Sequence, residues 1–336
     1  MARLAAILRA LALALRRDQK SLLNLAGNNF FIVSLLLLQK AGGFIYLIMG
    51  LVLLFPLSTD PLRKIPASRL ELWPLDRRER RLLRLASPWV NPMTWFIAAL
   101  AIWAARGRVS LGLWGLAAGL AAAGFVLSEL PGGPAHGLWR RVPSFPGALN
   151  QLIRKNVREM FATLDFYCAL ILAVAATVFR LLGKALPPEG LLALTILVVL
   201  ALSSYAQCLF GLDGRGGLSR YRLLPLRGWQ ILAAKDAAFL TIAIVLTLPL
   251  APSAGIGAAL VALAVGHEPS VNHPRPQMRW RFSSGASLMY GLFQAGAMGM
   301  AAAGVFFNGA FVLVLCAMAW ALSLWWYGRV IDLVRS

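Results

Sequence analysis

The stretch Ser68–Leu85, SRLELWPLDRRERRLLRL, is densely charged, although it lies in a chain that is 59% hydrophobic. It holds six arginines and three acidic residues. Part of this stretch recurs as SRYRLLPL, Ser219–Leu226, which matches SRLELWPL, Ser68–Leu75, at five of eight positions. The two copies are 151 residues apart. A charged phrase that occurs twice in an apolar chain indicates two related halves.

The composition is typical of an integral membrane protein. Only 14% of the 336 residues are charged, whereas a soluble domain averages about 25%. A membrane-spanning chain must satisfy its backbone polar groups internally, and apolar runs of about 20 residues do so as helices. The sequence therefore predicts an all-α membrane protein with about ten transmembrane helices.

The apolar runs predict four spans in the first half and six in the second. The first four are Leu23–Gln39, Gly42–Leu57, Pro92–Ala105 and Leu111–Leu130. The other six are Leu164–Leu182, Gly190–Phe210, Ala237–Leu250, Ser253–Val265, Ala286–Phe307 and Ala310–Trp326, of which the third and fourth are short. Each copy of the charged phrase falls in a loop between two pairs of spans, residues 58–86 and 211–235. The predicted halves are residues 1–135 and 136–336.

The basic residues predict the orientation of the spans. With the amino terminus inside, 28 of the 33 Lys and Arg residues fall in inner segments, as the positive-inside rule requires. Both termini are therefore expected to be cytoplasmic, in a bacterial-type inner membrane. The net charge of +20 would suggest nucleic acid in a soluble protein. Here the charge forms an inner collar, which favours membrane lipids over nucleic acid as partners.

Each half also carries amphipathic segments that are expected to lie along the inner membrane surface. In the first 20 residues Leu4, Leu8, Leu11 and Leu15 recur at helical spacing, and LIRKNVREMFATL, residues 152–164, is the equivalent in the second half. Proline suits the first position of a helix. Pro74 and Pro225 therefore predict short helices over Pro74–Ala86 and Pro225–Lys235, which would lie across the cytoplasmic mouth.

The second half resembles permeases of ATP-binding cassette (ABC) transporters of the type-2 exporter class. The resemblance covers Pro146–Ser336. It is carried by a closing pair of spans and by three stretches, LNQLIRKNVREMFATLDFY, LFGLDGRGGLSRYRLLPLRGWQILAAKDAAF and GHEPSVNHPRP. The first half resembles the family more loosely, through SRLELWPLDRRERRLLRLASPW. Family halves usually have six spans, so the four spans of the first half depart from the pattern.

The resemblance implies a permease subunit with amphipathic elbow helices and with coupling helices that contact a separate ATPase. The residues assigned to coupling are Pro74, Arg77, Arg78, Glu79, Arg81, Pro225, Arg227 and Trp229. ATP and Mg²⁺ would bind to the ATPase, and this chain would need no cofactor. One chain with both phrases could engage two ATPases; a homodimer or a second permease chain is the alternative.

Enzyme chemistry is not expected in this chain. The phosphate-binding motif GxxxxGK[ST] is missing, because its nearest match at Gly183-Lys184 has Val178 and Ala185 at required positions. His267 and His273 flank Glu268 without a third strong ligand, so no metal site is predicted. No GxSxG elbow occurs, and Ser283, Ser284 and Ser287 are expected to have no membrane-embedded histidine partner, which argues against an intramembrane hydrolase.

Polar residues in the spans allow two interpretations. They are Asn28, Asn29, Ser203, Ser204, Gln207 and Asn308. They could line a substrate path, or they could form hydrogen bonds between helices. The substrate itself is not readable, and lipids, peptides and hydrophobic drugs are all compatible. Two other functions stay open, a non-transporting membrane scaffold or assembly factor and a membrane-embedded enzyme.

Overall fold

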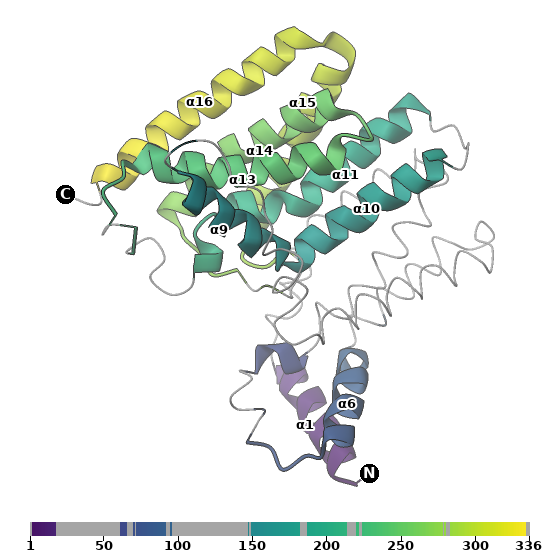
Figure 1. The fold of residues 1–336 in the computed structure, drawn as a ribbon. Coiled ribbons are helices and arrows are strands. Elements are labelled where there is room, and N and C mark those ends of the chain that lie inside the picture. Colours follow the sequence, from purple (N-terminus) through teal and green to yellow (C-terminus); the bar gives the residue numbers. More distant parts are fainter. Residues whose placement is uncertain are drawn as a thin grey trace. The chain divides into compact units, whose positions relative to one another are not determined.

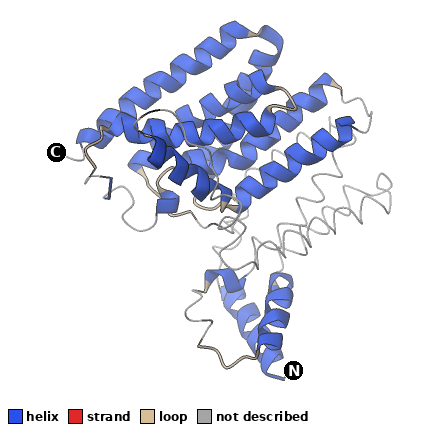
Figure 2. Cartoon of the chain, in the orientation of Figure 1, coloured by secondary structure: helices blue, strands red, loops and turns tan. Residues whose placement is uncertain are grey.

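The computed structural model describes residues 2–17, 61–65, 70, 72–91, 95, 147, 149–181, 187–213, 220–221, 224–277, 279 and 283–333. Every regular element in these residues is a helix (Figure 2). The predicted all-α class is thus confirmed for the described part of the chain. The four spans predicted for the first half lie almost entirely outside the described residues.

The chain divides into two compact units. The first comprises Met1–Ala26 and Gly43–Glu129, and the second comprises Gly27–Gly42 and Leu130–Ser336. The division into halves at residues 135 and 136, with four and six spans, stays a prediction.

In the first unit, two amphipathic helices lie side by side (Figure 1). They are α1 (Ala2–Arg17) and α6 (Arg77–Ala86), and two 3₁₀ turns accompany them, η2 (Pro61–Lys64) and η3 (Ser87–Val90). Leucines from α1, η2 and α6, and from the segment before α6, form the small core: Leu11, Leu62, Leu75 and Leu83. The amphipathic helix predicted at the amino terminus is therefore present, and its apolar side is buried against α6.

The second unit is a helical bundle. Its elements are α9 (Asn150–Phe161), α10 (Leu164–Leu181), α11 (Pro188–Gln207), η6 (Gly211–Asp213), α13 (Gly228–Thr247), α14 (Pro252–Asn272), α15 (Leu288–Asn308) and α16 (Ala310–Leu333). Helix α14 packs against α11, α13, α15 and α16. Helix α16 lies along the edge of this bundle (Figure 1). Helix α9 is the predicted amphipathic segment, and it buries Ile153, Asn156, Val157 and Met160.

Five helices are long and apolar enough to cross a membrane. They are Pro188–Gln207, Gly228–Thr247, Pro252–Asn272, Met289–Asn308 and Ala310–Leu333. Each has 20 to 24 residues, the length that a hydrocarbon core about 30 Å thick requires. Helix α10, Leu164–Leu181, has 18 residues and is also largely apolar. These helices support a membrane-embedded protein.

Two sequence predictions about α13 and α14 were wrong. The expected spans at 237–250 and 253–265 were short, whereas both helices are of full length. They continue through Lys235, Asp236 and His267, which looked like loop residues because they are polar. All three side chains are buried and paired inside the protein, so they do not end the helices. For the same reason Pro225–Lys235 is not a separate helix.

Candidate functional site

The two copies of the charged phrase adopt the same local backbone structure. We call residues 70–80 the first repeat motif and residues 221–231 the second. Three backbone hydrogen bonds, each from an N–H to a carbonyl oxygen, recur at equivalent positions. In the first motif they join Trp73 to Leu70 (3.3 Å), Leu75 to Trp73 (2.7 Å) and Arg80 to Asp76 (2.9 Å). In the second they join Leu224 to Tyr221 (3.2 Å), Leu226 to Leu224 (2.8 Å) and Ile231 to Arg227 (3.3 Å). The repeat seen in the sequence is therefore also a repeat of local conformation.

Each repeat motif starts its helix with the same type of cap. Asp76 and Arg227 precede the helices in extended conformation, with φ and ψ of −68° and 160° and of −70° and 152°. The Asp76 backbone N–H donates to Glu79 Oε2 at 3.2 Å. The Arg227 backbone N–H donates equivalently to Gln230 Oε1 at 2.8 Å. A Glu or Gln three residues after the cap is a known helix-start signal.

The prolines do not occupy the positions that the sequence predicted. Pro74 and Pro225 were expected at the first helical position, but the helices begin three residues later, at Arg77 and Gly228. Both prolines lie two residues before the cap, inside the tight turns closed by the Leu75–Trp73 and Leu226–Leu224 hydrogen bonds. The reciprocal hydrogen bond from the third helical residue fixes the start, and the proline shapes only the approach to it.

Most residues assigned to coupling are accessible. Pro74, Arg78, Arg81, Pro225, Arg227 and Trp229 are exposed, Glu79 is half-buried, and the side chain of Arg77 lies outside the described residues. Trp229 is a large apolar side chain with 45% of its surface exposed. Each repeat motif by itself is therefore accessible to a partner.

The helices that the two motifs begin differ in length. Helix α6 ends at Ala86 and passes into the 3₁₀ turn η3, which contains Pro88. Helix α13 instead continues for 20 residues as one of the five candidate spans. The second motif is thus the first part of a membrane-length helix, whereas the first motif belongs to a short helix of 10 residues.

The start of α13 is tightly packed against the end of α16. The Gly228 backbone N–H donates to Asp332 Oδ1 at 2.7 Å. A Cβ atom at Gly228 would lie 2.2 Å from the Gly328 carbonyl oxygen, and a Cβ at Gly328 would lie 2.7 Å from Trp229 Cβ. Only glycine allows this approach, so the second motif is fixed to α16 as well as to α13.

A buried ion pair joins α13 to α9 and to the segment between α11 and α13. The Lys235 side chain is 1% exposed, and its Nζ lies 2.7 Å from Asp213 Oδ2 and 3.2 Å from Asn156 Oδ1. Lys155 donates to Asp213 Oδ1, and the Tyr221 hydroxyl donates to the same oxygen at 2.9 Å. We call these five residues the Asp213 cluster. It connects the amphipathic helix α9 directly to the second repeat motif.

Charges in and near the Asp213 cluster shift two carboxyl groups in opposite directions. Burial alone would raise the pKa of Asp213, but Lys235 and Lys155 outweigh it, so this pKa lies below the ordinary value. Burial raises the pKa of Glu159, and Lys155 offsets this only in part. Asp213 therefore carries its negative charge and neutralises Lys235.

The first half has leucine at the positions of Asp213 and Tyr221, and the exposed Arg84 at the position of the buried Lys235. Counting back 151 residues, Asp213 corresponds to Leu62 and Tyr221 corresponds to Leu70. Leu62 is 4% exposed and belongs to the leucine core, with Leu70 packed against it. The two repeats therefore share a backbone motif but stabilise it by different means, leucine packing in one half and an ion pair in the other.

Ser204, one of the predicted substrate-path residues, belongs to a buried group around Asp165. Its hydroxyl donates to Asp165 Oδ2. Gln277 Nε2 donates to the same oxygen at 3.1 Å, and the Ser283 backbone N–H donates to Oδ1 at 2.7 Å. This group fastens the segment between α14 and α15 to α10 and α11.

Gln207 forms a second interhelical contact. Its Nε2 donates to Gln294 Oε1 at 2.7 Å, and Gln294 in turn donates to the Ala262 carbonyl oxygen at 2.6 Å. Helices α11, α15 and α14 are joined in this way. Ser204 and Gln207 thus form helix–helix hydrogen bonds, the second of the two interpretations.

The other predicted substrate-path residues are not part of these interhelical contacts. Ser203 donates to the Leu200 carbonyl of its own helix at 2.8 Å. Asn308 is exposed at the end of α15, and Asn28 and Asn29 lie outside the described residues. The substrate path stays a prediction.

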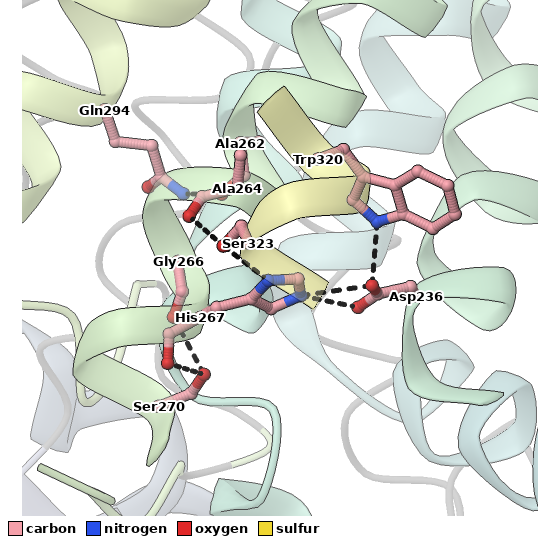
Figure 3. A network of polar contacts seen from close by, with 9 residues as sticks. All are labelled: Asp236, Ala262, Ala264, Gly266, His267, Ser270, Gln294, Trp320 and Ser323. Carbon is pink, nitrogen blue, oxygen red and sulfur yellow. Dashed lines mark hydrogen bonds and ion pairs between the residues drawn. The ribbon is translucent and has the colours of Figure 1, made fainter. Parts of the chain in front are cut away.

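A further polar network lies inside the bundle between α13, α14 and α16 (Figure 3). His267 Nε2 lies 3.0 Å from Asp236 Oδ2, and both side chains are 0% exposed. His267 Nδ1 lies 2.9 Å from Ser323 Oγ, which also lies 2.8 Å from the Ala264 carbonyl oxygen. Trp320 Nε1 donates to Asp236 Oδ2 at 2.8 Å. We call this set the His267 network.

Sequence reasoning missed the His267 network. It placed His267 in a loop and found no histidine within the membrane-spanning helices, whereas His267 lies in α14. The adjacent opposite charges of Lys235 and Asp236, between two apolar runs, were the signal that could have revealed it. His273 is 62% exposed and lies 3.8 Å from Glu268, so the two histidines do not share a site. Among the described residues, no three His, Cys, Asp or Glu side chains form a metal-binding group.

The order Ser323–His267–Asp236 has the composition of a hydrolase relay. The position of Ser323 disfavours acyl transfer here. Ser323 lies inside α16, where backbone N–H groups are used in helix hydrogen bonds and cannot stabilise an oxyanion. The geometry fits a polar junction between helices better than a nucleophile.

The described residues thus combine an accessible repeated surface motif with four buried polar groups, which lie around Asp213, Asp165, Gln207 and His267. The chain was compared with family models, with curated proteins and with solved structures. None of the three comparisons gives a match.

Proposed function

We propose that the chain is the transmembrane permease subunit of an ABC exporter, moved by a separate ATPase that binds the repeat motifs. The observation that carries this proposal is the second motif, whose exposed residues open a helix of membrane length. A push on Trp229 or Arg227 acts on α13 without an intervening joint. This is the property that a transport subunit without its own ATPase motif needs.

The Asp213 cluster supports the proposal because it joins further elements to α13, so that they would move together with it. Lys235 lies beyond Trp229 on α13 and binds Asp213 at 2.7 Å. Through Lys155 and Asn156 the same cluster holds α9, and Gly328 holds α16 against the motif. A displacement of the motif would therefore carry α9, α13 and the end of α16 together.

The remaining parts of the proposal depend on this assignment. The ATPase would bind on the cytoplasmic side, together with both termini, and would carry ATP and Mg²⁺. The chain would lie in a bacterial-type inner membrane, surrounded by lipids. Either one chain would engage two ATPase subunits through its two motifs, or two permease chains would each engage one.

The test is co-purification of the ATPase from the native host with the tagged full-length chain. Trp229→Ala and Arg227→Glu should each reduce the ATPase recovered and its stimulation by the chain. Trp326→Ala is the matched control, because Trp326 is an exposed tryptophan (60%) on α16 and belongs to neither repeat motif. Equal recovery with all three variants would overturn the proposal.

A second pair of variants separates the roles of the two motifs. Arg78→Glu with Arg81→Glu alters the exposed face of α6 and leaves the cap at Asp76 intact. If the first motif also binds an ATPase, this double variant should halve the amount of ATPase per chain. A wild-type chain that recovers no ATPase would instead favour a membrane scaffold.

A further inference from the structure

The His267 network has more hydrogen-bond contacts than its side chains can supply with protons while His267 is neutral and Asp236 is ionised. At one end the Trp320 N–H can only donate, and at the other end the Ala264 carbonyl can only accept. Between them lie three contacts: Ser323 to Ala264, Ser323 to His267, and His267 to Asp236. Each contact needs one proton.

A neutral His267 cannot supply all three contacts. Ser323 contributes one proton and a neutral imidazole contributes one, so one contact fails while Asp236 is ionised. A charged imidazolium donates from both nitrogens, to Ser323 and to Asp236, and leaves the serine proton for Ala264. The observed distances of 2.8 to 3.0 Å for the three contacts are all met only when the network holds this additional proton.

Removing that proton requires very little rearrangement. The Ser323 hydroxyl would rotate from the Ala264 carbonyl to His267 Nδ1, with no movement of heavier atoms. Ala264 lies within α14, where helix hydrogen bonds use its carbonyl as well. The proton can therefore bind and leave without breaking the packing of the bundle.

The surroundings contribute little other charge. Helix α15 has no acidic or basic residue, and from α16 the ring of Tyr327 faces His267 with 6.3 Å between ring centroids. From α11 the Tyr205 ring stacks on Phe239 of α13, with 6.3 Å between ring centroids. On α14 the neighbouring residue is Glu268, and on α13 Lys235 is turned to the Asp213 cluster. Asp236 is therefore the main charged partner of His267.

We propose that Asp236, His267 and Ser323 form a proton-binding site inside the bundle, and that its proton strengthens the junction of α13 with α14 and α16. With the proton bound, an ion pair of opposite charges joins α13 to α14. Without it, Asp236 keeps a buried charge beside a neutral ring, which is less favourable. The proposal does not depend on the identity of the transported substrate or of the partner.

The small number of histidines allows a direct test. The chain has three, so His136→Gln with His273→Gln leaves His267 alone. The full-length protein, labelled with ¹⁵N-histidine and placed in phosphatidylcholine nanodiscs, would be followed by NMR from about pH 5 to about pH 9. We expect two N–H-type ring resonances at the acid end and one unprotonated nitrogen at the alkaline end.

Two variants in the same background assign the transition. Asp236→Asn should move it toward acid pH, because a neutral amide no longer stabilises the charged ring. Ser270→Ala is the matched control, since the Ser270 hydroxyl donates to the Gly266 carbonyl at 2.7 Å and not to the ring; it should leave the transition unchanged. A ring that keeps one protonation state throughout, or a transition that Asp236→Asn does not move, would overturn the proposal.

A second measurement tests the strengthened junction. The thermal midpoint of the single-histidine protein should fall as pH rises through the transition seen by NMR. His267→Gln, whose side chain stays neutral, should lack this component. If His267→Gln does not fold, the pH dependence of the midpoint in Asp236→Asn provides the comparison, and a dependence equal to that of the parent would count against the proposal.

Discussion

Asp213→Asn is expected to be strongly destabilising. The substitution removes the carboxylate that neutralises Lys235, whose side chain is 1% exposed. The lysine would keep the Asn156 carbonyl oxygen at 3.2 Å, but its charge would have lost its counter-ion. Removing one partner of a buried ion pair costs about 3–5 kcal/mol. We expect the free energy of unfolding to fall by this amount.

Substituting the other member of the ion pair, Lys235, should lower the free energy of unfolding by less. Lys235→Met removes the buried cation, and Asp213 keeps Lys155 and the Tyr221 hydroxyl as donors. Replacing both charges by Asp213→Leu with Lys235→Met leaves no unpaired charge between them. Replacing a whole buried ion pair by apolar residues of similar volume is often neutral or stabilising. The first half already has leucine at the matching position, Leu62, in a closely packed core.

The assay is equilibrium unfolding of the full-length chain in mixed micelles of a mild detergent with increasing sodium dodecyl sulfate. Intrinsic fluorescence of the 11 tryptophans reports unfolding. The expected order of stability loss is Asp213→Asn, then Lys235→Met, then the double variant. A double variant as unstable as Asp213→Asn would refute the reasoning, because the loss would then come from packing and not from an unpaired charge.

Three further predictions concern the close helix contact, pH and the caps. Gly328→Ala should cost about 1–3 kcal/mol through overpacking, measured by the same unfolding assay, whereas Gly296→Ala, with no atom within 4 Å of its new Cβ, should cost little; equal effects would contradict the contact. Because the pKa of Asp213 is lowered, its contribution to stability is present above the unfolded value of about 4 and is lost as pH falls below it, so an acid titration should show a component that Asp213→Asn lacks. Glu79→Ala and Gln230→Ala should each cost about 1 kcal/mol by removing one capping hydrogen bond, and a tenfold difference in cost would argue against equivalent motifs.

Sequence periodicity and composition were sufficient to predict most helices of the second unit. Apolar runs without charges, such as those of α11 and α15, gave helix positions close to those observed, whereas α16 extends seven residues beyond its predicted end. The amphipathic segments α1 and α9 were also predicted, because residues three and four positions apart share one face of a helix. The repeat was visible in the sequence because it includes proline, which constrains the backbone, and a leucine, Leu75, that packs in the core of the first unit.

The errors arose where a charged residue has a buried partner far away in the sequence. Lys235 and Asp236 seemed to end a span, yet their partners Asp213 and His267 are 22 and 31 residues away. A single sequence does not reveal such pairs, because the cost of burying a charge depends on a contact that only the folded chain creates. The helix starts at Arg77 and Gly228 were missed for a related reason, since the cap depends on a side chain and not on the nearby proline.

The uninterrupted course of α13 has a mechanical consequence. Twenty residues at 1.5 Å each give a rod of about 30 Å, which is the thickness of the hydrocarbon core. Such a rod conveys a tilt imposed at one end to the other end with little loss, as a stiff lever does. Helix α6 ends at Ala86 and is followed by the turn at Ser87–Val90, so its 10 residues form a rod of only about 15 Å. Two motifs with nearly the same backbone would then differ in reach, one acting over the thickness of the bilayer and the other only locally.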